Sequence, residues 1–130
     1  MRSFILVTAF TLLFSGFTFA STQRTETVRV QVNHAKNAAH GRINLRFTKM
    51  IDDSRCPRDV QCIQAGEARI RVRVSRGRRA EVLTLSTNPR NGVASFGGYE
   101  FRLTALTPEQ RSNIRINPNG YVATIEVTKQ

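Results

Sequence analysis

Hydrophobic and polar residues alternate with a period of two along most of the chain after residue 27. Successive side chains of a β-strand point to opposite faces, so this period predicts strands that are apolar on one face and polar on the other. The cleanest run is residues 68–74, in which one Ala, one Ile and two Val alternate with three Arg. Further alternating runs occupy residues 28–32, 43–47, 81–85, 99–105 and 121–127.

The segments between these runs have the composition of turns and loops. Residues 34–41 predict a polar connection closed by a glycine, and residues 75–79 predict a hairpin turn. Residues 88–92 contain Asn, Pro and Gly, and residues 96–98 contain two Gly, so both segments predict turns that interrupt the strands. Thr107–Gln110 matches a single capped helical turn, with Thr as the cap and Pro at the first position.

Six to seven short amphipathic strands must pair into two sheets or close into a barrel to bury their apolar faces. No helical period of useful length occurs in the sequence. We therefore predict an all-β fold, an immunoglobulin-like antiparallel β-sandwich of six to seven strands. A small β-barrel is the alternative.

The first twenty residues follow another pattern. The run from Phe4 to Phe14 is almost unbroken in its apolar character; it follows Arg2 and stops before Ser15. Small residues at Thr18 and Ala20 suit positions −3 and −1 of a cleavage site. A membrane span needs about twenty apolar residues, more than this run supplies. We predict a cleaved signal peptide over residues 1–20 and one β domain over residues 21–130, exported to the periplasm or secreted, with no transmembrane anchor.

The chain is strongly basic. It contains 20 Lys and Arg residues against 9 Asp and Glu residues, a formal net charge of +11. Removal of residues 1–20 takes away only Arg2, and most of the remaining basic residues are Arg. Arg makes planar, bidentate contacts with carboxylate, sulfate and phosphate groups. This charge favours anionic partners, and it also serves solubility.

Cys56 and Cys62 are the only cysteines. An even pair in an exported chain predicts a disulfide. A zinc site would need two further ligands, and His34 and His40 lack a paired spacing. A redox pair usually has two intervening residues rather than five.

The segment that contains the cysteines, residues 52–66, is the most specific stretch of the chain. Asp53 and Ser54 can cap backbone donors, Pro57 fixes a turn, and Gly66 supplies a special backbone conformation before the next strand.

The carboxylates of this segment raise the question of a cation. Calcium takes six to eight oxygen ligands, and Asp52, Asp53 and Asp59 are of the required type. Their spacing matches no calcium loop, and Arg55 and Arg58 would neutralise them. We therefore expect salt bridges and caps, and no metal.

Two pieces of this segment carry a family resemblance. Residues 53–57 read Asp-Ser-Arg-Cys-Pro, and residues 62–66 read Cys-Ile-Gln-Ala-Gly. They resemble a segment of a family of small exported bacterial proteins and lipoproteins of unassigned function, in which a short spacer separates the two pieces and a β-strand follows. Residues 121–127 are similar to the last strand of that family, whereas Gln64 stands where the family has Trp. The resemblance implies an exported β-sandwich and no particular activity.

Arginines cluster around the alternating run 68–74. Three of them project from one face of the predicted strand, and the others continue the charge into the turn; the candidate polyanion-binding residues are Arg69, Arg71, Arg73, Arg76, Arg78 and Arg79. The patch becomes broad if Arg29, Arg46 or Arg102 lies on a neighbouring strand. The alternative is a solvated face whose charge protects an edge strand from aggregation.

We therefore predict an exported non-enzymatic binding or accessory domain without cofactors, with no catalytic residues assigned. Its expected partner is an anionic polysaccharide, lipopolysaccharide or another envelope protein, contacted through the Arg-rich face. Nucleic acid is not expected, because the chain lacks Trp and has no aromatic residues interleaved with the arginines.

Two other functions stay open. One is a structural or protein-interaction domain in which the charge serves solubility alone. The other is a small hydrolase. His34 and His40 are the only candidate bases at neutral pH, and neither belongs to a catalytic motif. A hydrolase would require a concave site beside one of these histidines.

Overall fold

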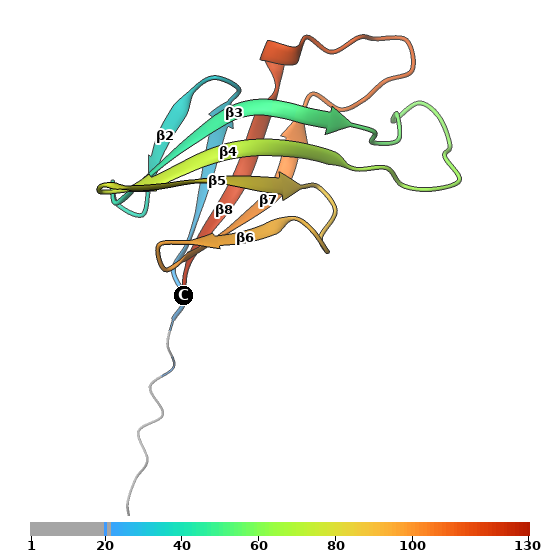
Figure 1. Ribbon diagram of the computed structural model, residues 1–130. Coiled ribbons are helices and arrows are strands. Elements are labelled where there is room, and N and C mark those ends of the chain that lie inside the picture. The colour runs from blue at the N-terminus through green and yellow to red at the C-terminus, as the bar shows by residue number, and fades with distance from the viewer. Residues whose placement is uncertain (1–19, 21) are drawn as a thin grey trace, which may run out of the picture.

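The described part of the chain forms eight β-strands (Figure 1). The computed structural model describes residues 20 and 22–130, so the predicted signal peptide, apart from Ala20, lies outside the described residues. The strands are β1 (Thr25–Gln31), β2 (Ala35–Ala38), β3 (Ile43–Asp53), β4 (Ala68–Arg76), β5 (Arg79–Ser86), β6 (Val93–Phe96), β7 (Tyr99–Thr107) and β8 (Val122–Lys129).

The strands form two antiparallel sheets of four, in the orders β1-β8-β7-β6 and β2-β3-β4-β5. Neither β1 and β2 nor β5 and β6 are hydrogen-bonded neighbours, so the two sheets do not close into a barrel. The predicted antiparallel β-sandwich is confirmed. Constant-type immunoglobulin sheets take strands from separated parts of the chain, whereas here each sheet is a run of consecutive strands, completed in one sheet by β1.

The core lies between the sheets and is built by the period-two pattern. On β4, the side chains of Ala68, Ile70, Val72 and Val74 are fully buried, and the arginines between them are exposed. The largest fully buried side chain of the facing sheet is Phe101. Each buried aliphatic or aromatic side chain of this size stabilises the fold by about 1.5–3 kcal/mol. The apolar period therefore fixes which face of each strand is left for solvent or a ligand.

Two strands lie where the sequence pattern predicted connections. Strand β2 falls inside the predicted polar connection 34–41, and β6 lies between the two predicted breaks. Each has four residues, of which only Ala38 and Phe96, respectively, are buried. A segment this short shows almost no alternation, and its strand geometry comes from hydrogen bonds to β3 or β7.

The predicted helical turn at 107–110 is wrong. Thr107 is the last residue of β7, and residues 108–110 are not helical. The Arg55 guanidinium donates to the carbonyl oxygens of Leu106 (2.6 Å) and Pro108 (2.8 Å). A lone helical turn gains one hydrogen bond for several fixed residues, so it competes poorly with these contacts. A single 3₁₀ turn instead occupies Pro118–Gly120. Within the described part of the chain, no helix is long and apolar enough to cross a membrane.

Candidate functional site

The outer face of the sheet β2-β3-β4-β5 carries five basic side chains on its two central strands. They are Arg46 and Lys49 on β3 and Arg69, Arg71 and Arg73 on β4, here named the cationic face. Arg46 lies directly opposite Arg73, Lys49 opposite Arg71, and Asp52 opposite Arg69. All five basic residues are exposed.

Lys49 is a member of this face that the sequence pattern missed. Strict alternation from Arg46 would place Thr48 outward and Lys49 inward. A register shift between Phe47 and Lys49 moves Lys49 to the side of the arginines. An irregularity of this kind leaves no clear trace in a hydrophobic pattern, because one extra residue merely interrupts the alternation.

Among the described residues, an acidic partner is found for only one of the five basic side chains. Arg69 forms a salt bridge with Asp52, and its Nε lies 3.0 Å from each carboxylate oxygen. The hydrogen bond from Arg69 lowers the pKa of Asp52. Arg46, Lys49, Arg71 and Arg73 form no ion pair with any described residue.

The four unpaired cations make a two-by-two array. Side chains directly opposite on antiparallel strands are about 5 Å apart at Cβ, and alternate residues along a strand are about 7 Å apart. Both cross-strand pairs of the array are pairs of like charge. Like charges directly opposite each other destabilise a sheet. The fold therefore holds these charges together without gaining stability from the arrangement.

The structure separates the predicted polyanion-binding residues from one another. Arg69, Arg71 and Arg73 share the cationic face. Arg76 and Arg79 instead lie on the side of their strands that faces the core, where they cover the end of the sandwich. The guanidinium of Arg76 lies 5.7 Å from the centre of the Tyr99 ring, and that of Arg79 lies 5.8 Å from the centre of the Phe96 ring.

Of the remaining arginines, Arg78 lies in the β4–β5 turn, outside the cationic face. Arg46 broadens the face, as the sequence analysis allowed. Arg29 and Arg102 do not, because their strands belong to the other sheet.

The outer face of that other sheet has balanced charge. Its charged residues are Arg29 on β1, Glu100 and Arg102 on β7 and Glu126 on β8. Arg102 pairs with Glu100 at 3.3 Å and lies opposite Glu126. An excess of positive charge is therefore a property of one sheet face and not of both.

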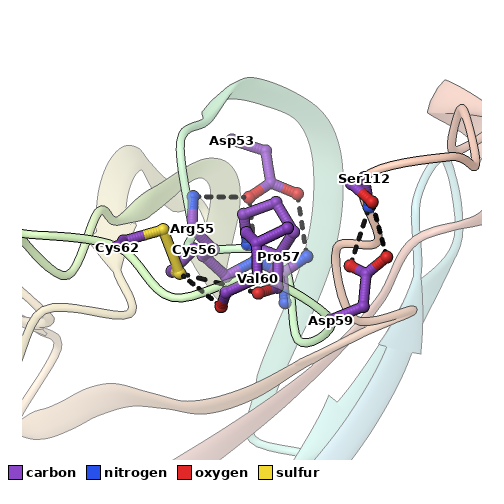
Figure 2. The surroundings of a disulfide bond; sticks show 8 residues. All are labelled: Asp53, Arg55, Cys56, Pro57, Asp59, Val60, Cys62 and Ser112. Atoms are coloured by element: carbon purple, nitrogen blue, oxygen red, sulfur yellow. Dashed lines mark hydrogen bonds and ion pairs between the residues drawn. A yellow bond between two sulfur atoms is a disulfide. The ribbon is translucent and has the colours of Figure 1, made fainter.

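The disulfide between Cys56 and Cys62 is present, as predicted, with a Cα–Cα distance of 6.0 Å. Next to it lies a charged cluster that includes Asp53 and Arg55 (Figure 2). Arg55 donates from Nε and Nη2 to the two carboxylate oxygens of Asp53, both at 2.8 Å. The Tyr121 hydroxyl donates to the same carboxylate at 2.9 Å. The side chains of Asp53 and Arg55 are only 7% and 16% exposed.

This cluster, Asp53, Arg55 and Tyr121, is here named the clasp. Burial acts to raise the pKa of Asp53, but hydrogen bonds from Arg55 and Tyr121 outweigh it, so the pKa lies below its ordinary value. Burial and the hydrogen bond to Asp53 raise the pKa of Tyr121 to about 12. Arg55 also binds carbonyls at the end of β7, so the clasp ties the cysteine loop to the segment that precedes β8.

A second set of contacts joins the same two loops farther out. Asp59 accepts a hydrogen bond from the Ser112 backbone at 2.9 Å and another from its hydroxyl (Figure 2). These hydrogen bonds lower the pKa of Asp59. Arg58 pairs with Glu109 on the exposed surface. Asp52, Asp53 and Asp59 thus each have a separate protein partner.

A glycine is required at position 66 because the Ser54 backbone lies directly against it. Its φ is not in the left-handed region, in contrast to the sequence interpretation. A Cβ at this position would lie 1.6 Å from the Ser54 carbonyl oxygen, so no larger residue fits. The close approach is held by Ser54, whose backbone N–H and hydroxyl both donate to the Glu67 carbonyl at 2.8 Å.

The two histidines lie in different surroundings. His34 Nδ1 is 3.0 Å from the Val32 carbonyl oxygen. His40 lines a depression at the end of the sandwich where β1 begins and β8 ends. Neither histidine forms a hydrogen bond with a hydroxyl or carboxylate side chain within the described residues. Of the two histidines, His40 thus lies beside a concave surface of the kind that the hydrolase alternative requires.

Fold and surface together define a small disulfide-bonded β-sandwich with one cationic face. No family model, no curated protein and no solved structure matches the chain.

Proposed function

We propose that the protein is an exported, non-enzymatic binding domain that holds an anionic polysaccharide against its cationic face. The observation that carries this proposal is the array of Arg46, Lys49, Arg71 and Arg73, in which like charges lie opposite each other without acidic partners. A bound polyanion removes that repulsion, and the release of its counterions supplies binding free energy.

The surroundings of the array favour a linear polymer. The neighbouring outward residues on β2 and β5 include Ala35, Asn37, Val82 and Thr84, all small or medium in size. No aromatic side chain projects from this face in the described strands. Protein interfaces usually place aromatic anchors at their centre, and single-stranded nucleic acids usually stack on aromatic rings. A flat cationic surface without either suits sulfate, phosphate or carboxylate groups along a sugar chain.

A direct binding experiment tests this function. The affinities of heparin, as a sulfated polysaccharide, and of lipopolysaccharide are measured for the wild type and for Arg71→Gln/Arg73→Gln by isothermal titration calorimetry. Loss of two cationic contacts is expected to weaken heparin binding by about tenfold or more near physiological salt. Unchanged affinity in the double variant would overturn the proposal and favour the role of the charge in solubility alone.

The two ligands separate the source of the anionic groups. Tighter binding of lipopolysaccharide than of heparin, lost in the same double variant, would place the recognised phosphates on a lipid-linked saccharide. Equal loss for both ligands would assign the face to anionic polysaccharides in general.

A further inference from the structure

The depression beside His40 is a second basic surface, at the end of the sandwich. It is bounded by the segment that leads into β1, the turn between β2 and β3, and the last residues of β8. These three segments meet at the end where the described chain begins and ends (Figure 1). The volume of the depression is about 1380 Å³. Ligand sites commonly occupy roughly 300–1,000 Å³, so this one can hold a ligand of saccharide size.

The rim of the depression carries an excess of positive charge. Arg24, Arg42 and Lys129 all line it, all are exposed, and none forms an ion pair with a described residue. The one acidic residue in the lining is Glu26, whose carboxylate accepts a hydrogen bond from the Ala39 backbone N–H at 2.7 Å. The cations therefore face a depression whose one acidic side chain is already hydrogen-bonded to the protein.

The backbone of the turn is held in an unusual conformation at this place. Ala39 and His40 have φ values of 53° and 56°, and Gly41 continues the left-handed run at 82°. Such angles are costly for residues other than glycine, and they persist only where the surroundings hold them. Here the hydrogen bond from Ala39 to Glu26 ties the turn to β1. The turn places His40 and Arg42 beside the depression, so the strained residues and the charged lining coincide.

The floor of the depression supplies the apolar component of a ligand site. Tyr99 and Val127 contribute to the lining although both belong to the buried core. An apolar floor with a few convergent polar groups is the usual composition of a small-molecule site.

We propose that this end depression binds an anionic mono- or disaccharide through a carboxylate or phosphate group, with Arg24, Arg42 and Lys129 as the binding cations. The site is separate from the cationic face, because it lies at the end of the sandwich and involves neither β4 nor the outward side chains of β3. It does not depend on the function proposed for that face.

Nuclear magnetic resonance titration of the purified protein tests the site. The probes are glucose 6-phosphate and glucuronate, with neutral glucose as the control ligand. Saturable shifts are expected for the amides of residues 22–26, 39–42 and 129–130 with one or both anionic sugars, and none with glucose. A response to only one of them identifies the anionic group. Equal response to glucose, absence of a saturable response, or shifts centred on β3 and β4 would overturn the proposal.

Variants with matched charge complete the test. Arg42→Gln/Lys129→Gln is expected to weaken binding of the responding sugar by about tenfold, as two charge-assisted contacts are lost. Arg29→Gln/Arg102→Gln removes the same charge from the balanced face, and Arg71→Gln/Arg73→Gln removes it from the cationic face. Both should bind the sugar as the wild type does. Equal weakening in all three variants would show that net charge alone is responsible, and would refute a built site.

Discussion

Arg55 and Arg71 show two opposite uses of the same residue type. Arg55 is largely buried, and its guanidinium donates to the Asp53 carboxylate and to two backbone carbonyls. Arg71 is exposed, lies opposite Lys49, and has no acidic partner among the described residues. The first is committed to the fold, whereas the second remains available to a ligand.

This difference shows that the arginines of a basic protein can be divided between those that support the fold and those that are available for binding. The donors of Arg55 are satisfied inside the protein, so its loss should affect stability and leave binding intact. The side chain of Arg71 forms no ion pair with a described residue, so its loss should affect binding and leave stability intact.

Removal of the clasp arginine should have the largest effect. Arg55→Leu leaves Asp53 without its ion-pair partner and leaves two carbonyl oxygens without a donor. Loss of one partner from a buried pair is strongly destabilising, and we expect the free energy of unfolding to fall by about 2–4 kcal/mol. Urea denaturation measures the change. The control is Arg58→Leu, whose exposed pair with Glu109 should contribute less than about 1 kcal/mol. Equal losses in the two variants would contradict the structural role of the clasp.

Removal of the disulfide should cause the second-largest loss of stability. Cys56→Ala/Cys62→Ala opens a short loop, and the chain-entropy relation gives a loss of about 2 kcal/mol. Heparin affinity should be unchanged, because the loop lies outside the cationic face. Parallel unfolding and heparin titrations of the double variant check both statements, and a large fall in affinity would show that the loop takes part in binding.

The clasp should also make the free energy of unfolding depend on pH in the acidic range. Because the pKa of Asp53 is lowered in the folded state, its contribution is fully present above the ordinary Asp value of about 3.9 and is lost as the pH falls through the folded value. Unfolding free energies measured from pH 6 to pH 2 should fall less steeply for Asp53→Asn than for the wild type. Arg71→Gln/Arg73→Gln should retain the wild-type slope. If the unfolding free energy of Asp53→Asn fell with pH as steeply as that of the wild type, the acid sensitivity could not be assigned to Asp53.

The cationic face should contribute least to stability. Arg71→Gln/Arg73→Gln removes both like-charge cross-strand pairs. We expect the free energy of unfolding to stay within about 0.5 kcal/mol of the wild type, or to rise by a few tenths at low salt. Thermal unfolding at low and high salt checks this, since a gain from reduced repulsion should disappear in salt. A loss of several kcal/mol would show that these arginines support the fold.

The sequence pattern was sufficient for the sandwich and for the faces of its long strands. The alternation of Ile70, Val72 and Val74 with arginines predicted both the buried and the exposed side of β4. The disulfide followed from an even pair of cysteines in a chain predicted to be exported. These features depend on local periodicity and on composition, both of which a single sequence displays.

The features that the pattern missed depend on contacts between distant residues. Strands β2 and β6 exist because β3 and β7 pair with them, and Lys49 joins the cationic face through an irregularity in β3. Arg55 lies 51 residues from Leu106 in sequence, and their contact replaces the helical turn expected at 107–110. The alternation along β4 already indicated that Arg76 lies on the same side of the strand as the buried residues. The composition of the following turn nevertheless suggested that all of these arginines form one continuous patch.

The most direct test of the cationic face is the salt dependence of heparin binding. The association constant is measured between 50 and 300 mM NaCl for the wild type, for Arg71→Gln/Arg73→Gln and for Arg29→Gln/Arg102→Gln, two variants of equal net charge. If the face holds the polyanion, the slope of log K against log salt should become shallower by about two for the first variant and stay near the wild-type value for the second. Equal changes in both slopes would contradict the account, because the response would then follow net charge and not the array on β3 and β4.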